Sequence, residues 1–137
     1  LNQFQMKKII LDTNFLMIPL QFRVDIFSEF DRICNFNYKL LIYESTINEL
    51  KKIMQTGSLK NKKAAQFGLK LIKLKNINII KSDQEDADSL ILGNLDDGTI
   101  IATQDMQLKR ELRNKGASLI ILRQKKYLQL IMRDQYS

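Results

Sequence analysis

Four acidic side chains stand far apart in the sequence, yet their positions predict that a parallel α/β fold brings them together. Asp12 directly follows the apolar run KKIIL, and Asp105 comes two residues after the apolar run TIIAT. Glu49 falls in the first turn of the helix expected after YKLLIY, and Asp88 heads the helix expected before TIIAT. Open parallel sheets bind their ligands at the carboxyl ends of the strands. We therefore expect these four carboxylates at one rim of the sheet, with Asp86 beside them.

Carboxylates that share a small space repel one another, and a divalent cation offsets this repulsion. Oxygen ligands of this kind suit Mg²⁺ or Mn²⁺, which also take up water and phosphate oxygens. Such a site activates water and neutralises charge on a phosphodiester. The chain has no histidine and Cys34 is its only cysteine, so a Cys/His metal site and an internal disulfide are both excluded.

Each acid also has a structural explanation at its own position. Asp12 and Asp105 could cap the helices that follow them, the latter together with Thr103. Residues 46–49 read TINE, a capping box in which Glu49 would bond back to the helix start. An acid at 86 or 88 stabilises a helix N-terminus through the helix dipole. These explanations act one residue at a time, and none of them accounts for four acids at one rim.

Apolar runs and helical periodicities predict the elements that hold these acids. Strands are expected at residues 7–12, 38–43, 77–80, 99–103 and 118–122. Helices are expected at residues 23–36, 45–55, 60–75, 85–95, 105–116 and 124–133. Strands without polar alternation that are separated by helices indicate an α/β fold with a mainly parallel five-stranded sheet covered on both faces. We expect one domain over residues 1–137, with residues 1–6 disordered or placed ahead of a natural start at Met6.

The charge and hydropathy of the chain indicate the compartment and the kind of partner. The net charge is +7 and the pI is about 9.5, which favours binding to polyanions. No apolar stretch approaches the roughly 20 residues that cross a bilayer. The first residues, LNQFQMKK, lack the pattern of a signal peptide. We expect a cytoplasmic protein that does not contact a membrane.

Four segments carry a resemblance to a known family: IILDTNFLM, INEL, DADSLIL and IIATQDMQLKRELRNKG. In this order and spacing they resemble the PIN-domain nucleases, and the resemblance covers most of the chain. The ending LKRELRNKGASLIILRQKKYLQL is particularly similar to the PIN proteins of the small-subunit processome, which act in pre-ribosomal RNA processing. The resemblance implies a Rossmann-like fold and a Mg²⁺- or Mn²⁺-dependent endoribonuclease that cuts RNA, with ribosomal RNA processing as its role.

The resemblance also assigns roles to residues of this chain. It implies that the acids of the family's catalytic site, which bind the metal, are Asp12, Glu49, Asp88 and Asp105. The family often has two adjacent acids at the third position, whereas this chain has Asp86, Ala87 and Asp88, so either acid or both could face the metal. Polar positions that hydrogen-bond the acids or the metal's waters match Asn14 and Thr103. Lys109, Arg110 and Arg113 could contact the RNA backbone, or they could face solvent alone.

Two other functions stay open. The chain could be the ribonuclease toxin of a toxin–antitoxin pair, silenced by a small antitoxin. It could also be an RNA-binding or assembly protein of a pre-ribosomal particle, with a weak metal site. A homodimer is a further expectation of this kind of fold. An aspartyl-phosphate phosphatase would need an acid where this chain has Asn14, and a receiver domain would need an acidic neighbour of Asp12, so neither class fits.

Overall fold

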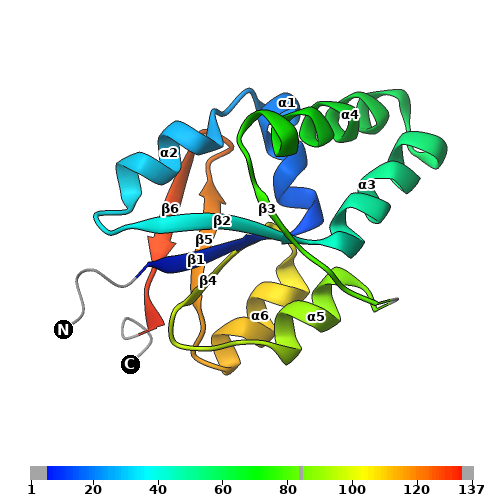
Figure 1. Cartoon of the computed structure of the whole chain (residues 1–137). Coiled ribbons are helices and arrows are strands. Elements are labelled where there is room, and N and C mark those ends of the chain that lie inside the picture. Colours follow the sequence, from blue (N-terminus) through cyan, green and yellow to red (C-terminus); the bar gives the residue numbers. More distant parts are fainter. Residues whose placement is uncertain (1–5, 84, 134–137) are drawn as a thin grey trace.

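The computed structural model describes residues 6–83 and 85–133, and six strands in it form one sheet (Figure 1). The strand order is β3-β2-β1-β4-β5-β6. The five strands from β3 to β5 in this order are parallel, and β6 runs antiparallel to β5. The bounds are β1 (Lys7–Leu11), β2 (Tyr38–Tyr43), β3 (Asn78–Ile80), β4 (Thr99–Ala102), β5 (Ser118–Arg123) and β6 (Tyr127–Ile131). The predicted α/β class and mainly parallel sheet are confirmed.

Helices cover both faces of this sheet (Figure 1). They are η1 (Thr13–Met17), α1 (Ile18–Phe22), α2 (Ile26–Ile33), α3 (Glu44–Thr56), α4 (Leu59–Leu74), α5 (Ala87–Gly93) and α6 (Met106–Asn114). Along β1, Ile9 and Leu11 pack with η1 and α1–α4, whereas Ile10 packs on the other face with α5 and α6. Successive side chains of a strand point to opposite faces, so an unbroken apolar run serves two cores at once.

The C-terminal segment differs from the prediction, because residues 124–133 hold strand β6 rather than a helix. Gln124 and Lys125 both have positive φ, 53° and 56°, and the amide of Lys126 donates to the Arg123 carbonyl at 2.9 Å. This is the geometry of a tight two-residue hairpin turn. In β6 the buried Leu128 lies between exposed neighbours, a period-two pattern that suits a strand at the sheet edge. The sheet therefore has six strands and not five.

Within residues 6–83 and 85–133, no helix is long and apolar enough to cross a membrane. Apart from Met6, the residues expected to be disordered or to precede the natural start lie outside the described part of the chain.

Helix α4 packs closely against η1, the segment that directly follows Asp12. A Cβ atom at Gly68 would lie 2.7 Å from the carbonyl oxygen of Leu16, a backbone atom that cannot turn away. We expect Gly68→Ala to lower the free energy of unfolding by about 1–3 kcal/mol, as overpacking does. Gly93→Ala is the matched control, since its Cβ would meet no atom within 4 Å. If Gly68→Ala and Gly93→Ala have equal free energies of unfolding in urea, the close packing of α4 against η1 is wrong.

Candidate active site

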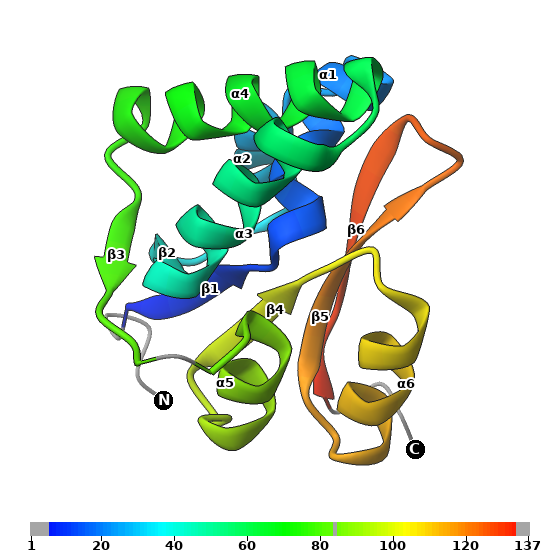
Figure 2. The same cartoon turned by 90° about the vertical axis from the view of Figure 1, so that its right-hand side faces the viewer.

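A pocket of about 310 Å³ opens where β1 and β4 end. In Figure 2 this edge of the sheet lies between α3 on one side and the starts of α5 and α6 on the other. All five acids that the sequence singled out are among its lining residues, which are Asp12, Thr13, Asn14, Glu49, Ile53, Asp86, Asp88 and Asp105. β1 and β4 are neighbours in the sheet and parallel, so the residues that follow them emerge side by side. Segments up to 93 positions apart thus meet in one pocket.

Asp12 is the most buried of the five acids, with 4% of its surface exposed. Its Oδ2 accepts a hydrogen bond from the Thr103 hydroxyl at 2.8 Å, and its Oδ1 accepts one from the Thr13 amide at 2.9 Å. Burial raises the pKa of Asp12, the two hydrogen bonds oppose that rise, and the negative charges of Glu49 and Asp105 add to it. The carboxylate caps η1 and also faces the pocket.

Thr103 links the two acids at the ends of β1 and β4. While its hydroxyl donates to Asp12, the same oxygen accepts the backbone N–H of Asp105 at 3.0 Å. Asp105 in turn caps α6, because its Oδ1 accepts the amide of Leu108 at 2.8 Å. One buried hydroxyl thereby ties the Asp12 carboxylate to the backbone of Asp105, and the cap of α6 holds the Asp105 carboxylate.

Glu49 does not complete the capping box that the sequence suggested. Helix α3 begins at Glu44 with Tyr43 as its N-cap, so Glu49 lies beyond the first turn. Its Oε1 accepts a short hydrogen bond from the Thr13 hydroxyl, and its Oε2 accepts the backbone N–H of Ala87 at 3.1 Å. The carboxylate therefore joins α3 to η1 and to the start of α5.

Asp86 and Asp88 have different surroundings. Asp86 caps α5 by accepting the Ser89 amide at 3.2 Å, and hydrogen bonds with Ser89 hold its pKa below the ordinary range. Asp88 is partly buried, and this burial together with the charges of Asp12, Asp105 and the other pocket acids raises its pKa to about 7. Removal from water and like charge are the two causes that a bound cation would offset. Asp88 is thus the acid of this pair with the stronger electrostatic coupling to the pocket.

Asn14 lines the pocket, but its hydrogen bonds are with Gln104 and involve backbone groups of both residues. Its side-chain oxygen accepts the amide of Gln104 at 3.4 Å, and the Gln104 side chain donates to the Asn14 carbonyl at 3.3 Å. The two hydrogen bonds tie the segment after β1 to the segment after β4. Asn14 therefore connects two loops at the pocket, and its side chain makes no hydrogen bond to a carboxylate among the described residues.

Two pocket residues were not singled out from the sequence. Thr13 holds Glu49 through its hydroxyl, which also lies 3.3 Å from the Thr46 hydroxyl. Ile53 contributes an apolar side chain to the pocket lining. It follows Glu49 by four residues, and this spacing places both on one face of α3. Helical spacing counted from Glu49 would have found Ile53, whereas only the folded chain shows the bond from Thr13.

The charged side chains that line the pocket are all carboxylates among the described residues, and carboxylate oxygens suit Mg²⁺ and Mn²⁺. Within residues 6–83 and 85–133, no three Asp, Glu or Cys side chains already form a group that could hold a metal. Mg²⁺ does not need such a cage, because it uses one or two carboxylates and completes its shell with water and phosphate oxygens. Burial is the first cause of the raised pKa values of Asp12 and Asp88, and the negative charges of the neighbouring pocket acids add to it. The residues fit a divalent cation.

The raised pKa of Asp88 predicts how metal-free protein responds to pH. An unfolded aspartate loses its proton at lower pH than this one, so the folded state binds more protons between about pH 4 and about pH 7. Stability in EDTA should therefore fall as pH rises through this interval. Asp88→Asn should flatten the fall, which urea unfolding at several pH values measures. Identical pH dependence in the variant and in wild type would show that Asp88 is not the group responsible.

Comparison with known proteins places the chain in a family. The family model of the PIN-like domain matches residues 9–125, and the chain belongs to this family. It is similar to "Ribonuclease VapC4" of Methanocaldococcus jannaschii, 30% identical over 127 residues, 91% of this chain and 97% of the relative. It is also similar to "Ribonuclease VapC9" of Archaeoglobus fulgidus, 32% identical over 117 residues, 85% and 84% of the two chains.

A solved structure shares the fold. The PIN domain endonuclease Utp24 aligns with a TM-score of 0.72, over 90% of this chain and 90% of that one. The sequence identity is 20%, so this likeness concerns the fold alone. The predicted Rossmann-like PIN fold is confirmed by the family match and by this alignment.

Proposed function

We propose that this protein is a metal-dependent endoribonuclease that hydrolyses RNA phosphodiester bonds. The observation that carries the proposal is the convergence of Asp12, Glu49, Asp88 and Asp105 on one pocket at the ends of β1 and β4. The two relatives of about 30% identity or more are both named ribonucleases, which supports RNA as the substrate. The net charge of +7 favours a polyanion in the same way.

In this proposal Asp12, Asp88 and Asp105 hold Mg²⁺ or Mn²⁺, with some of the contacts made through water and Asp86 at the edge of the ligand set. The bound ion would supply charge neutralisation for the scissile phosphate and activation of water. Thr103 holds the Asp12 carboxylate and the backbone N–H of Asp105, and the Leu108 amide holds the Asp105 carboxylate, so both carboxylates are oriented before substrate arrives. Glu49, held by Thr13 and Ala87, orients the attacking water. The water oxygen would bond to phosphorus and give up a proton to the solvent, the bond from phosphorus to the leaving oxygen would break, and that oxygen would take up a proton from the solvent.

Two cellular roles follow from different observations. Ribosomal RNA processing rests on the similarity of the C-terminal segment to small-subunit processome proteins, and it implies a pre-ribosomal particle as partner. A toxin held by a small antitoxin is supported by the two relatives that carry the VapC name and align over most of their length. The second role has the stronger sequence support. The cytoplasm and a homodimer belong to the proposal in either role.

The test is incubation of end-blocked, internally labelled RNA with the protein in Mn²⁺, in Mg²⁺ and in EDTA. Ribosomal precursor RNA and transfer RNA serve as two separate substrates. The proposal predicts internal cuts with either metal and intact RNA in EDTA. Cuts confined to the precursor would support processing, and cuts confined to transfer RNA would support the toxin role. If RNA stays intact under every condition but still binds, the protein is an RNA-binding or assembly protein and not an enzyme.

A further inference from the structure

A second groove lies beside α6, next to the proposed active site. It encloses about 420 Å³ between one face of α6 and the end of β5. From α6 it is lined at helical spacing by Met106, Lys109, Arg110, Arg113 and Asn114, and from β5 by Ile121, Leu122 and Arg123. Met106 follows Asp105 directly, so the groove starts where the wall of the acidic pocket ends. Figure 2 shows α6 against β5, with the β5–β6 hairpin beyond.

The described residues that line this groove include four cations and no acid. In the described part of the chain, no ion pair involves Lys109, Arg110, Arg113 or Arg123. Partial burial lowers the pKa of Lys109, and the positive charges of Arg113 and Arg123 lower it further. Cations held together in this way repel one another, and an anion in the groove would remove that cost.

The groove also has an apolar side. The exposed part of this side is Met106, 69% exposed, at the end nearest the acidic pocket. From β5, Ile121 is only 2% exposed, and Leu122 packs against the core on the other face of the sheet. Single-stranded nucleic acid presents phosphates along its backbone and unpaired bases with apolar faces. A groove with four cations and the exposed Met106 can contact both parts of such a strand. A duplex would offer only its phosphates, because its bases are stacked inside.

We infer that this groove binds the single-stranded RNA backbone on one side of the scissile phosphate and guides the strand into the acidic pocket. The inference rests on the proposed function and deepens it by naming the path and the form of the substrate. Arg113 and Arg123 are the residues that carry it, because they approach the groove from two different elements and are both exposed. Arg123 was not among the candidates that the sequence offered.

The test measures RNA binding apart from cleavage. Fluorescence anisotropy of a labelled single-stranded RNA in EDTA, with an Asp12→Asn background, reports affinity without turnover. Arg113→Gln with Arg123→Gln should weaken binding by about tenfold or more and reduce the slope of log K against log salt by about 0.7 for each phosphate that the variant no longer neutralises. The charge-keeping pair Arg113→Lys with Arg123→Lys should bind nearly as wild type does. It also controls for the hydrogen bond from Arg123 to Gln129 at 2.6 Å.

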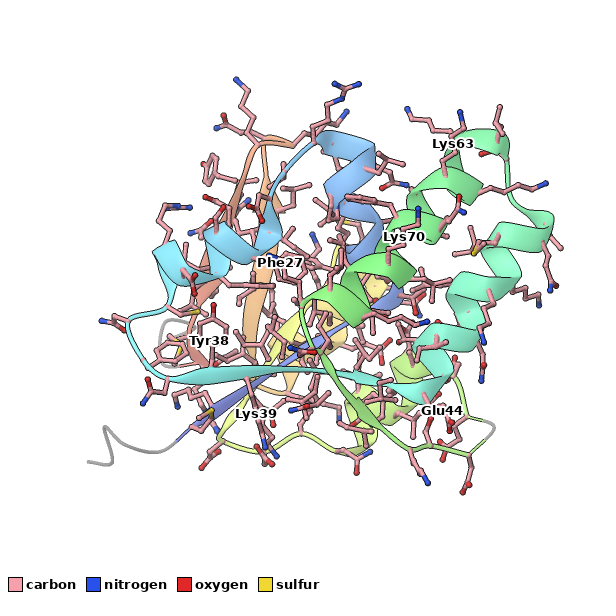
Figure 3. All side chains as sticks on the ribbon, turned by 45° about the horizontal axis from the view of Figure 1, so that its top comes forward. Phe27, Tyr38, Lys39, Glu44, Lys63 and Lys70 are labelled. Atoms are coloured by element: carbon pink, nitrogen blue, oxygen red, sulfur yellow. The ribbon has the colours of Figure 1, made fainter. Side chains whose placement is uncertain are left out.

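The matched control is Lys63→Gln with Lys70→Gln, which removes the same charge from exposed positions on α4. Figure 3 shows both lysines on α4, and this helix packs on the opposite face of the sheet from α6. The control pair should lose little affinity. Equal losses in the two glutamine pairs would overturn the inference, and so would tighter binding of an RNA duplex of equal length.

A protein partner in the groove is the other outcome that would overturn it. Polyglutamate that binds as tightly as RNA, and loses affinity equally in the arginine variant, would assign the groove to an acidic protein. Because binding is measured without metal, the result is separate from the proposed function. If the arginine variant loses RNA affinity but the wild-type protein cleaves no RNA, the proposed activity is wrong and the proposed RNA-binding groove is retained. If the wild-type protein cleaves RNA but the arginine variant binds it normally, the groove proposal is wrong and the activity is retained.

Discussion

Asp12→Asn should abolish most RNA cleavage while leaving the fold intact. Replacing a residue that only supports a ligand costs roughly 10–100-fold, so the loss of a direct ligand should exceed about 100-fold. The fold should persist because the asparagine side chain is of the same size and its oxygen can keep the bond from the Thr13 amide. The Thr103 hydroxyl can turn to accept from the new NH₂ group. Initial cleavage rates in Mn²⁺ measure the effect.

The melting temperature of Asp12→Asn is the second readout. The variant removes a buried charge that Glu49 and Asp105 oppose, so metal-free protein should melt at the same temperature as wild type or higher. Asp97→Asn is the matched control, since the side chain of Asp97 is 92% exposed and lies outside the pocket. It should keep full activity. Full activity in Asp12→Asn, with folding unchanged, would refute the role assigned to Asp12.

Glu49 should show a separation between stability and activity. In Glu49→Ala the Ala87 amide loses its acceptor, and Ala87 is 1% exposed, while the Thr13 hydroxyl keeps only its contact with Thr46. An unsatisfied buried donor costs about 1–3 kcal/mol, so the free energy of unfolding should fall by about that amount. Cleavage should fall as well, because the carboxylate is gone. Urea unfolding and cleavage rates in Mn²⁺ give the two quantities.

Glu49→Gln distinguishes a catalytic role from a structural one. Its oxygen can accept the Ala87 amide, while its NH₂ group faces Thr13, whose hydroxyl has Thr46 as a second partner. Stability should therefore stay near that of wild type, while cleavage should drop as in Glu49→Ala. If the glutamine variant cleaves RNA at the wild-type rate, Glu49 acts only as a tie between α3, η1 and α5.

Much of the site could be predicted because it depends on strand ends. Apolar runs without polar alternation indicate buried parallel strands, and the carboxyl ends of neighbouring parallel strands lie together. Asp12 and Asp105 follow directly from this rule once β1 and β4 are adjacent. The hydroxyl of Thr103 between them agrees with its predicted position beside the acids. The catalytic roles themselves remain proposals.

What could not be predicted depends on contacts between distant segments. The sequence around Glu49 fits a capping box, and only the start of α3 at Glu44 shows that the box does not form. Residues 124–133 contain apolar side chains at positions that suit either a helix or a strand. The strand forms because of the turn at Gln124 and Lys125 and the pairing with β5. This turn lacks the glycine or asparagine that usually marks a two-residue hairpin turn in a sequence. Tertiary pairing overrides local preference here.

We propose that acids from separate segments share one divalent cation in the pocket at the ends of β1 and β4. Diffraction from crystals soaked in Mn²⁺, measured at a wavelength where manganese scatters anomalously, tests it most directly. We expect an anomalous peak inside the pocket, in contact with carboxylate oxygens of Asp12 and Asp105, that is absent from Asp12→Asn crystals. A well-ordered pocket with no such peak in wild-type crystals, or manganese bound only elsewhere on the molecule, would contradict it.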